Sequence, residues 1–199
     1  TLAQRQQLFY PAYLKDLTGF RTLRFLDWGR TNFSKVSSWK NRPQLTDRSW
    51  AGDNGVPIEL AFQLAAAAKA DPWINIPMLA DDDYVRQFAT LARTSLHSGD
   101  NLILEYANET WNLGFPVAKV LLERARTEWP QEVAKGTRDD QLSLNYYAKR
   151  SVQICQMVKT EFGNAASSVK CVVNTQAAVP NTTDTVLGCK IAQQDLGNA

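Results

Sequence analysis

The sequence contains few of the residues on which metal centres and disulfide-rich scaffolds depend. It has a single histidine, His97, and three cysteines, at positions 155, 171 and 189, with no CxxC pair among them. A zinc site built from cysteine and histidine is therefore not expected, and we predict no metal and no cofactor. Three cysteines allow one internal disulfide with one thiol left over. A bond between Cys171 and Cys189 would close a short loop, but the sequence does not choose among the pairings.

Long apolar runs and a strong charge of one sign are also absent. No stretch approaches the ~18 apolar residues that a transmembrane helix requires, so no transmembrane helix is predicted. Lys and Arg number 22 against 20 Asp and Glu, a net charge of +2. Without a basic stripe, a nucleic-acid partner is not expected. The 199 residues, 44% of them hydrophobic, are enough for one packed domain or for part of a larger one.

The sequence does contain a regular alternation of helical and strand patterns. Helices are predicted over residues 2–17, 58–70, 81–97, 116–129, 141–162 and 183–194, and strands over 20–28, 72–79, 102–109 and 169–177. A loop is predicted from residue 29 to about residue 57, and loops of that length are usually functional or disordered. Strands that alternate with helices favour parallel βαβ units, so we expect the four strands to be adjacent in chain order.

Two α/β architectures fit this order, the doubly wound sheet and the TIM barrel. The sequence has no glycine-rich phosphate loop of the kind that favours the doubly wound sheet. Three strands end in polar or aromatic residues, and barrel enzymes place their sites at that edge. The residues are Asp27 and Trp28, Asn108 and Glu109, and Asn174 and Gln176. We therefore predict part of a (β/α)8 TIM barrel with about four parallel strands.

A complete barrel has eight strands, which is more than this sequence provides. Four strands alone would leave two edges of unpaired backbone groups. Residues 1–199 are accordingly interpreted as a single incomplete barrel domain. The remainder of the barrel, or another copy of the chain, is the expected partner that completes it.

The segment "LEYANETWN", residues 104–112, carries the strongest functional signal. It resembles strand four of the retaining TIM-barrel glycoside hydrolases of clan GH-A, which ends in an Asn-Glu pair. The resemblance implies that Glu109 is the general acid/base and that Asn108 hydrogen-bonds the sugar 2-hydroxyl. Arg24 stands where strand two of that clan often has an arginine near the floor of the site. Glu105 also matches the E-x-x-N-E spacing, and we expect it to be a buried partner of Arg24.

A retaining glycosidase needs a second carboxylate as nucleophile, ~5–5.5 Å from the first. In the clan this is a glutamate that ends strand seven. The resemblance covers about residues 20–177, and the other glutamates are predicted on helices or linkers. The nucleophile is therefore expected outside this chain. Glu109 also has a simpler interpretation, as a solvated carboxylate or a cap of the next helix.

Further residues near the predicted strand ends are candidates for binding a carbohydrate. Substrate contacts are predicted for Asp27, Trp28, Asn75, Trp111 and Asn174, in addition to Arg24 and Asn108. Each has a structural alternative: the tryptophans can belong to the core, and Asp27 can anchor its loop. Trp111 is the preferred sugar platform, because an aromatic plane matches the apolar face of a pyranose ring.

Three N-x-S/T sequons, at Asn32, Asn108 and Asn181, weakly favour a secreted, extracellular protein. We predict glycans on loops at Asn32 and Asn181, and none at Asn108, where a glycan would fill the cleft. Two functions remain open. One is a glycoside hydrolase that acts on a β-linked polysaccharide. The other is a non-catalytic extracellular protein with a glycosidase-like fold that binds glycans or has a structural role.

Overall fold

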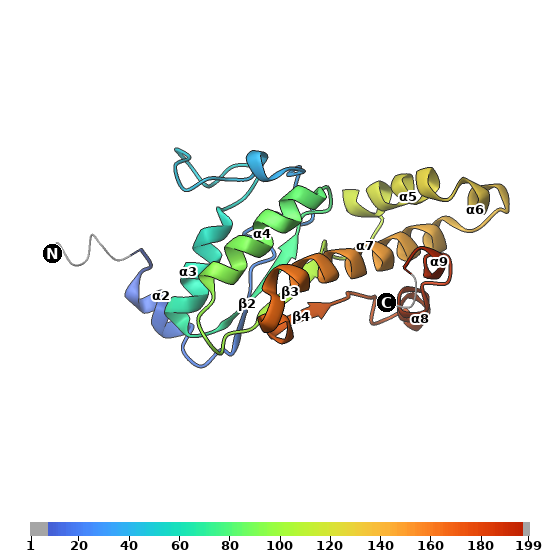
Figure 1. Cartoon of the computed structure of the whole chain (residues 1–199). Coiled ribbons are helices and arrows are strands. Elements are labelled where there is room, and N and C mark those ends of the chain that lie inside the picture. Colours follow the sequence, from blue (N-terminus) through green and yellow to red (C-terminus); the bar gives the residue numbers. More distant parts are fainter. Residues whose placement is uncertain (1–7, 197–199) are drawn as a thin grey trace.

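The four predicted strands form one parallel sheet. In the computed structural model, which describes residues 8–196, the strands lie in the order β1-β2-β3-β4, and every neighbouring pair is parallel (Figure 1). They span Thr22–Arg24, Asp71–Ile76, Leu102–Tyr106 and Val169–Val172. The predicted α/β class, the strand order and the parallel pairing are confirmed. Closure into a barrel remains a prediction.

Each strand is shorter than the sequence predicts. β1 ends at Arg24 rather than at residue 28, and the chain then turns, with Gly29 donating a backbone hydrogen bond to Phe25 at 3.3 Å. β3 ends at Tyr106, because Ala107 has a left-handed backbone with φ of 54°. Apolar and aromatic residues continue beyond the point where the backbone leaves the sheet, so composition overestimates strand length.

The long helices lie close to their predicted positions. They are α3 (Ile58–Ala68), α4 (Asp82–Ser95), α5 (Pro116–Glu128) and α7 (Asp139–Phe162). The Asp81 carboxylate caps α4 by accepting a hydrogen bond from the backbone N–H of Tyr84 at 2.7 Å. Such a cap satisfies one of the free donors at a helix N-terminus.

The shorter helices differ more from the predictions. Within the predicted helix 2–17, α2 covers only Pro11–Asp16, and residues 1–7 lie outside the described part of the chain. The polar linker after α5 contains α6 (Pro130–Ala134). The predicted last helix is two helices, α8 (Pro180–Gly188) and α9 (Gln193–Leu196), because Cys189 has a positive φ of 28° that ends α8.

One face of the sheet is covered by helices and is apolar; we call it the helix-covered face. α3 contacts β2, α7 contacts β3 and β4, and α4 packs between α3 and α7 (Figure 1). The strand side chains on this face are buried among them: Ile74, Ile76, Leu102, Leu104 and Tyr106. Alternate residues of a strand point to opposite faces, so this face takes every second residue.

The remaining strand residues point to the other side, which we call the open face. Strand register places Arg24 beside Trp73 and Trp73 beside Ile103, with Glu105 two residues further along β3. Trp73 and Ile103 are half-buried and Arg24 is exposed, whereas Glu105 is buried. Parallel sheets are normally covered on both faces. The barrel prediction therefore depends on whether the remainder of a barrel, or another copy of the chain, covers the open face.

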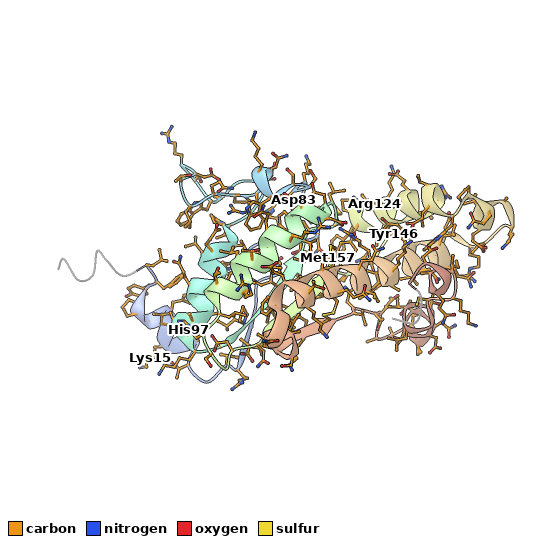
Figure 2. All side chains as sticks on the ribbon, viewed as in Figure 1. Lys15, Asp83, His97, Arg124, Tyr146 and Met157 are labelled. Carbon is orange, nitrogen blue, oxygen red and sulfur yellow. A yellow bond between two sulfur atoms is a disulfide. The ribbon has the colours of Figure 1, made fainter. Side chains whose placement is uncertain are left out.

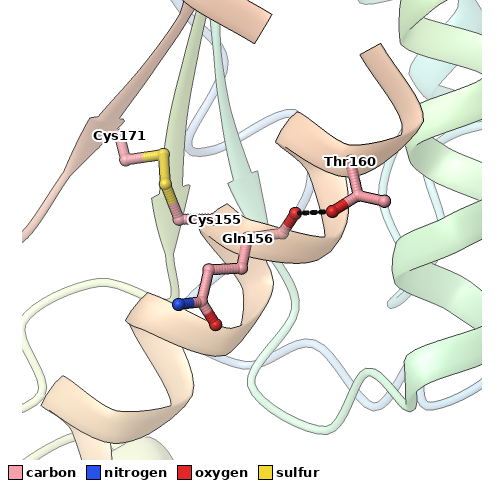
Figure 3. The surroundings of a disulfide bond; sticks show 4 residues. All are labelled: Cys155, Gln156, Thr160 and Cys171. Carbon is pink, nitrogen blue, oxygen red and sulfur yellow. Dashed lines mark hydrogen bonds between the residues drawn. A yellow bond between two sulfur atoms is a disulfide. The ribbon is translucent and has the colours of Figure 1, made fainter. Parts of the chain in front are cut away.

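A disulfide joins the helical layer to the last strand. Cys155 on α7 is bonded to Cys171 on β4, sixteen residues apart in the sequence (Figure 3). Cys189 is the free cysteine. The sequence left the pairing open, and the structure pairs Cys155 with Cys171 because α7 packs against β4.

The predicted long loop between β1 and α3 is confirmed, with one short 3-10 turn, η1 (Trp39–Asn41). Its end returns to its start, where the backbone N–H of Val56 donates to the Trp28 carbonyl at 2.7 Å. Gly55 allows this approach, since it has a φ of +83° and a Cβ there would lie 2.2 Å from the Trp28 carbonyl oxygen. Arg42 pairs with Glu59 of α3 at 2.7 Å and ties the loop to that helix.

Candidate functional site

The Asn108–Glu109 pair lies in a turn directly after β3, not on the strand as the sequence suggested. Ala107 and Glu109 both have left-handed backbones, with φ of 54° and 44°. Residues other than glycine adopt this conformation at a cost, and it is frequent at functional sites. The turn therefore holds the two polar side chains at the carboxyl-terminal edge of the sheet, where parallel α/β proteins bind their ligands.

An ion pair between Arg24 and the buried carboxylate of Glu105 supports this turn. The Arg24 guanidinium donates to the Glu105 carboxylate at 2.8 Å, as predicted, and Glu105 has a side-chain exposure of only 1%. The indole N–H of Trp73 donates to the same carboxylate oxygen at 2.7 Å, and Arg24 stacks over the Trp73 ring at 4.8 Å. A buried carboxylate needs such partners, so Glu105 has a structural role.

Asn108 is held on both sides of its amide. Its oxygen accepts a hydrogen bond from Arg24 at 2.9 Å, and its nitrogen donates to the side-chain oxygen of Asn32 at 3.0 Å. Asn108 is buried, which agrees with the expectation that it carries no glycan. A glycan on Asn32, however, would lie against Asn108, so the predicted Asn32 glycan and the predicted cleft compete for the same space.

Glu109 is half-buried and has one side-chain partner among the described residues. The Asn112 amide nitrogen donates to its carboxylate at 2.9 Å, and the Asn112 oxygen accepts from the backbone N–H of Gly114, also at 2.9 Å. This short chain of hydrogen bonds orients the carboxylate and leaves its second oxygen without a partner within residues 8–196. The arrangement leaves that oxygen available to a ligand.

Asn75 holds the same turn from the neighbouring strand β2. Its amide nitrogen donates to the Ala107 carbonyl at 2.7 Å. Its oxygen is buried and has no protein hydrogen-bond partner within the described chain. The position agrees with a role near the site, and the direct contact is with the backbone beneath Asn108 and Glu109.

Asn174 lies on the opposite side of β3, just beyond β4. Its amide nitrogen donates to the Tyr106 carbonyl at 3.4 Å, and its backbone N–H donates to the Tyr147 hydroxyl at 2.6 Å. Burial raises the pKa of Tyr147 well above its ordinary range, so this hydroxyl stays neutral. The Asn174 side-chain oxygen is buried and lacks a protein partner within residues 8–196.

Among the described residues, the predicted contacts Asp27, Trp28 and Trp111 are not part of this hydrogen-bonded group. Asp27 is exposed in the turn after β1. Trp28 packs edge-to-face against Phe25 at 5.2 Å and lines a narrow cavity beneath the long loop, together with Asn75. Trp111 is half-buried against the main core. For the tryptophans the packing agrees better with the structural alternative than with sugar stacking.

The structure adds residues that the sequence patterns did not assign to the site. Asn32 was considered only as a glycan acceptor, and Asn112 was not considered, yet both hydrogen-bond to the Asn108–Glu109 pair. Phe33, which follows Asn32, and Phe115, three residues after Asn112, meet edge-to-face at 5.6 Å. Asn32 and Phe33 lie about 75 residues before Glu109 in the sequence, so no local pattern links them to it.

The single histidine, His97, and the predicted glycan site Asn181 lie away from the site. His97 follows the carboxyl-terminal end of α4, and Figure 2 shows it at the opposite end of that helix from Asp83. Asn181 is exposed as the second residue of α8 rather than on a loop.

Among residues 8–196 no cluster of three or more His, Cys, Asp or Glu side chains could hold a metal ion. No helix in this part of the chain is long and apolar enough to cross a membrane.

Comparison of the chain with protein-family models, with curated proteins and with solved structures yields no match.

Proposed function

We propose that this chain forms one part of the cleft of a retaining glycoside hydrolase-like barrel, with Glu109 as general acid/base. One observation carries the proposal: the ion pair of Arg24 and Glu105 holds Asn108 beside a half-exposed Glu109 at the carboxyl-terminal edge of a parallel sheet. Acid/base catalysis at a glycosidic oxygen requires an accessible carboxyl group and an oriented amide, both held in place by the surrounding structure.

Each group then has a definite chemical task. Glu109 donates a proton to the leaving glycosidic oxygen and later removes one from the attacking water. Asn108 keeps one amide hydrogen and one oxygen lone pair beyond those used by Asn32 and Arg24. These remaining groups hydrogen-bond a sugar hydroxyl next to the cleaved bond.

The nucleophile belongs, in this proposal, to the remainder of the barrel or to another copy of the chain. Glu105 is unsuited to the task, because Arg24 and Trp73 already bind its carboxylate in a buried position. The other glutamates lie on the helices α3, α5, α6 and α7: Glu59, Glu123, Glu128, Glu132 and Glu161. The secreted location and the Asn181 glycan remain parts of the same proposal.

Hydrolysis of aryl β-glycosides and β-linked polysaccharides by the complete barrel tests the catalytic role. Glu109→Gln should lower the rate on substrates with poor leaving groups by roughly 10²–10⁴-fold, the usual share of general acid/base catalysis. Azide should restore part of the rate on activated substrates, because this small anion can replace the water that Glu109 activates.

Glu123→Gln is the matched control, because it makes the same change on an exposed side chain of α5. It should leave the rate unchanged. Equal rates for Glu109→Gln and wild type on every substrate would exclude the acid/base role.

A second candidate is a non-catalytic glycan-binding protein with the same fold. It is favoured by the lack, among residues 8–196, of a carboxylate other than Glu105 at the carboxyl-terminal ends of the strands β2, β3 and β4. A complete protein that binds β-linked oligosaccharides without cleaving them would decide for this candidate.

A further inference from the structure

The narrow cavity beneath the long loop is separate from the Asn108–Glu109 turn. It has a volume of about 40 Å³, and residues of β2, α3, α4 and both ends of the long loop form its wall. Neither Asn108 nor Glu109 lines it. The apolar part of the wall includes side chains of the helix-covered side of the sheet and of the loop, among them Phe25, Trp28, Val36, Ala61 and Ile74.

One polar group of this wall has no protein partner. Tyr84 on α4 lines the cavity and is only 4% exposed, and its hydroxyl makes no hydrogen bond with any residue of the described chain. Burial raises the pKa of Tyr84 well above its ordinary value, so the hydroxyl stays neutral. A buried hydroxyl without a partner is costly. The position of this group in the wall of a cavity therefore points to a ligand that bonds it.

Ser34 brings a second hydroxyl group to the same wall. It is fully buried, and its oxygen accepts a hydrogen bond from the backbone N–H of Val36 at 3.3 Å. That bond uses a lone pair of the oxygen and leaves the hydroxyl hydrogen available. The cavity thus offers hydrogen-bond donors to an oxygen atom of a ligand.

The charge in the wall is already compensated. Arg42 lines the cavity, and its side chain is 10% exposed. Its guanidinium pairs with Glu59 at 2.7 Å, donates to the Pro43 carbonyl at 3.0 Å and lies over the Trp39 ring at 4.0 Å. A charged ligand would lose its hydration without gaining a counter-ion, which is costly. The electrostatics of the wall therefore favour a neutral ligand.

The volume of the cavity limits the size of this ligand. A single water molecule needs roughly 10–15 Å³, whereas a cavity that binds benzene has about 150 Å³. A volume of about 40 Å³ lies between these limits. It suits a molecule of about four non-hydrogen atoms and is too small for an aromatic or a sugar ring.

We propose that this cavity is a second binding site, which takes a small neutral alcohol or amide. The polar group of the ligand hydrogen-bonds the Tyr84 hydroxyl, and its apolar part packs against Phe25, Trp28 and Ile74. The long loop encloses the ligand, because the hydrogen bond from Val56 to the Trp28 carbonyl joins the two ends of the loop at the cavity wall. This inference does not depend on the proposed carbohydrate site.

Titrations followed by two-dimensional NMR of the backbone amides test the site with two pairs of probes. Propan-2-ol and acetamide are neutral, and isopropylammonium and acetate match them in size but carry a charge. Both neutral probes should shift the amide signals of Val36, Ala61 and Tyr84 in a saturable way, with dissociation constants in the millimolar range because so few atoms make contact. The charged probes should cause no saturable shift.

Two variants and a matched control locate the binding. Tyr84→Phe removes only the hydroxyl and should weaken the binding of propan-2-ol about tenfold, as expected for one lost hydrogen bond. Ala61→Val reduces the space in the cavity and should also weaken binding. Tyr146→Phe makes the same change on α7 in a half-buried side chain that does not line the cavity, and it should bind like wild type. Circular dichroism checks that each variant is folded.

The results that would overturn the site are equally definite. They are the lack of a saturable shift with both neutral probes, or equal affinities of wild type and Tyr84→Phe. Equal binding of a neutral probe and its charged counterpart would overturn the assignment to neutral ligands. None of these results bears on hydrolysis by Glu109, which the Glu109→Gln variant tests separately.

Discussion

On the helix-covered face of the sheet, strand side chains are apolar and buried, while the open face carries Arg24, Trp73, Glu105 and Lys170. The two faces come from the same four strands, residue by residue in alternation. The first face derives its stability from packing against α3 and α7, with α4 between these two helices. On the second, a hydrogen-bonded ion pair supports the turn with Glu109. One face therefore determines whether the chain folds, and the other carries the candidate chemistry.

A matched pair of isoleucines makes this difference measurable. Ile76 is fully buried on the helix-covered face, whereas Ile103 is half-buried on the open face. Ile76→Ala should lower the free energy of unfolding by about 2–5 kcal/mol, because it leaves a cavity that the helices cannot fill. Ile103→Ala should cost clearly less. Urea unfolding followed by circular dichroism measures both, and equal losses would show that the open face is covered in solution.

The disulfide tests how far β4 depends on the helical layer. Cys155 and Cys171 close a loop with a sequence separation of 16. Replacing both by serine should reduce stability by about 3 kcal/mol, because the unfolded chain is then less constrained. Cys189→Ser removes the free thiol and is the control, with little expected change. Thermal unfolding of all three proteins gives the comparison, and an unchanged double variant would contradict it.

The ion pair on the open face should matter less for stability and more for the site. Arg24→Met leaves the buried Glu105 carboxylate with only the Trp73 N–H and should cost about 1–3 kcal/mol. Adding Glu105→Leu should recover part of that loss, because apolar pairs can replace buried ion pairs. A double-mutant cycle measures the coupling. Additive losses would mean that the two side chains do not interact in solution.

Alkaline pH should act mainly through the helix-covered face. Burial raises the pKa of Tyr106 from 10.0 to about 12, and its hydroxyl donates to the Met78 carbonyl at 2.8 Å. The unfolded chain therefore loses this proton first as the pH rises. Stability is fully present below pH 10 and falls between about pH 10 and pH 12, by about 1 kcal/mol at pH 11 from this residue alone.

Tyr106→Phe should make that alkaline decline shallower, and urea midpoints measured across this pH range give the slope. A decline of the same steepness in the variant would assign it to other groups.

The local pattern of the sequence was sufficient for the elements and their order. The long helices appear within a few residues of prediction, since their apolar periodicity and flanking signals are local. The pairing of Arg24 with Glu105 was also predictable, because both fall on one face when strands are read in alternation and an unpaired buried charge is costly.

What only the tertiary structure decided involves contacts between distant segments. It placed Asn32 beside Asn108 and paired Cys155 with Cys171. It also places Asn108 and Glu109 in a turn after β3 rather than on the strand, because the left-handed backbone of Ala107 ends β3 early. Residue type and spacing determine which face of an element is apolar. The packing of the whole chain determines which distant residue a polar side chain contacts. Composition and local spacing do not specify such contacts, because the two residues lie far apart in the sequence.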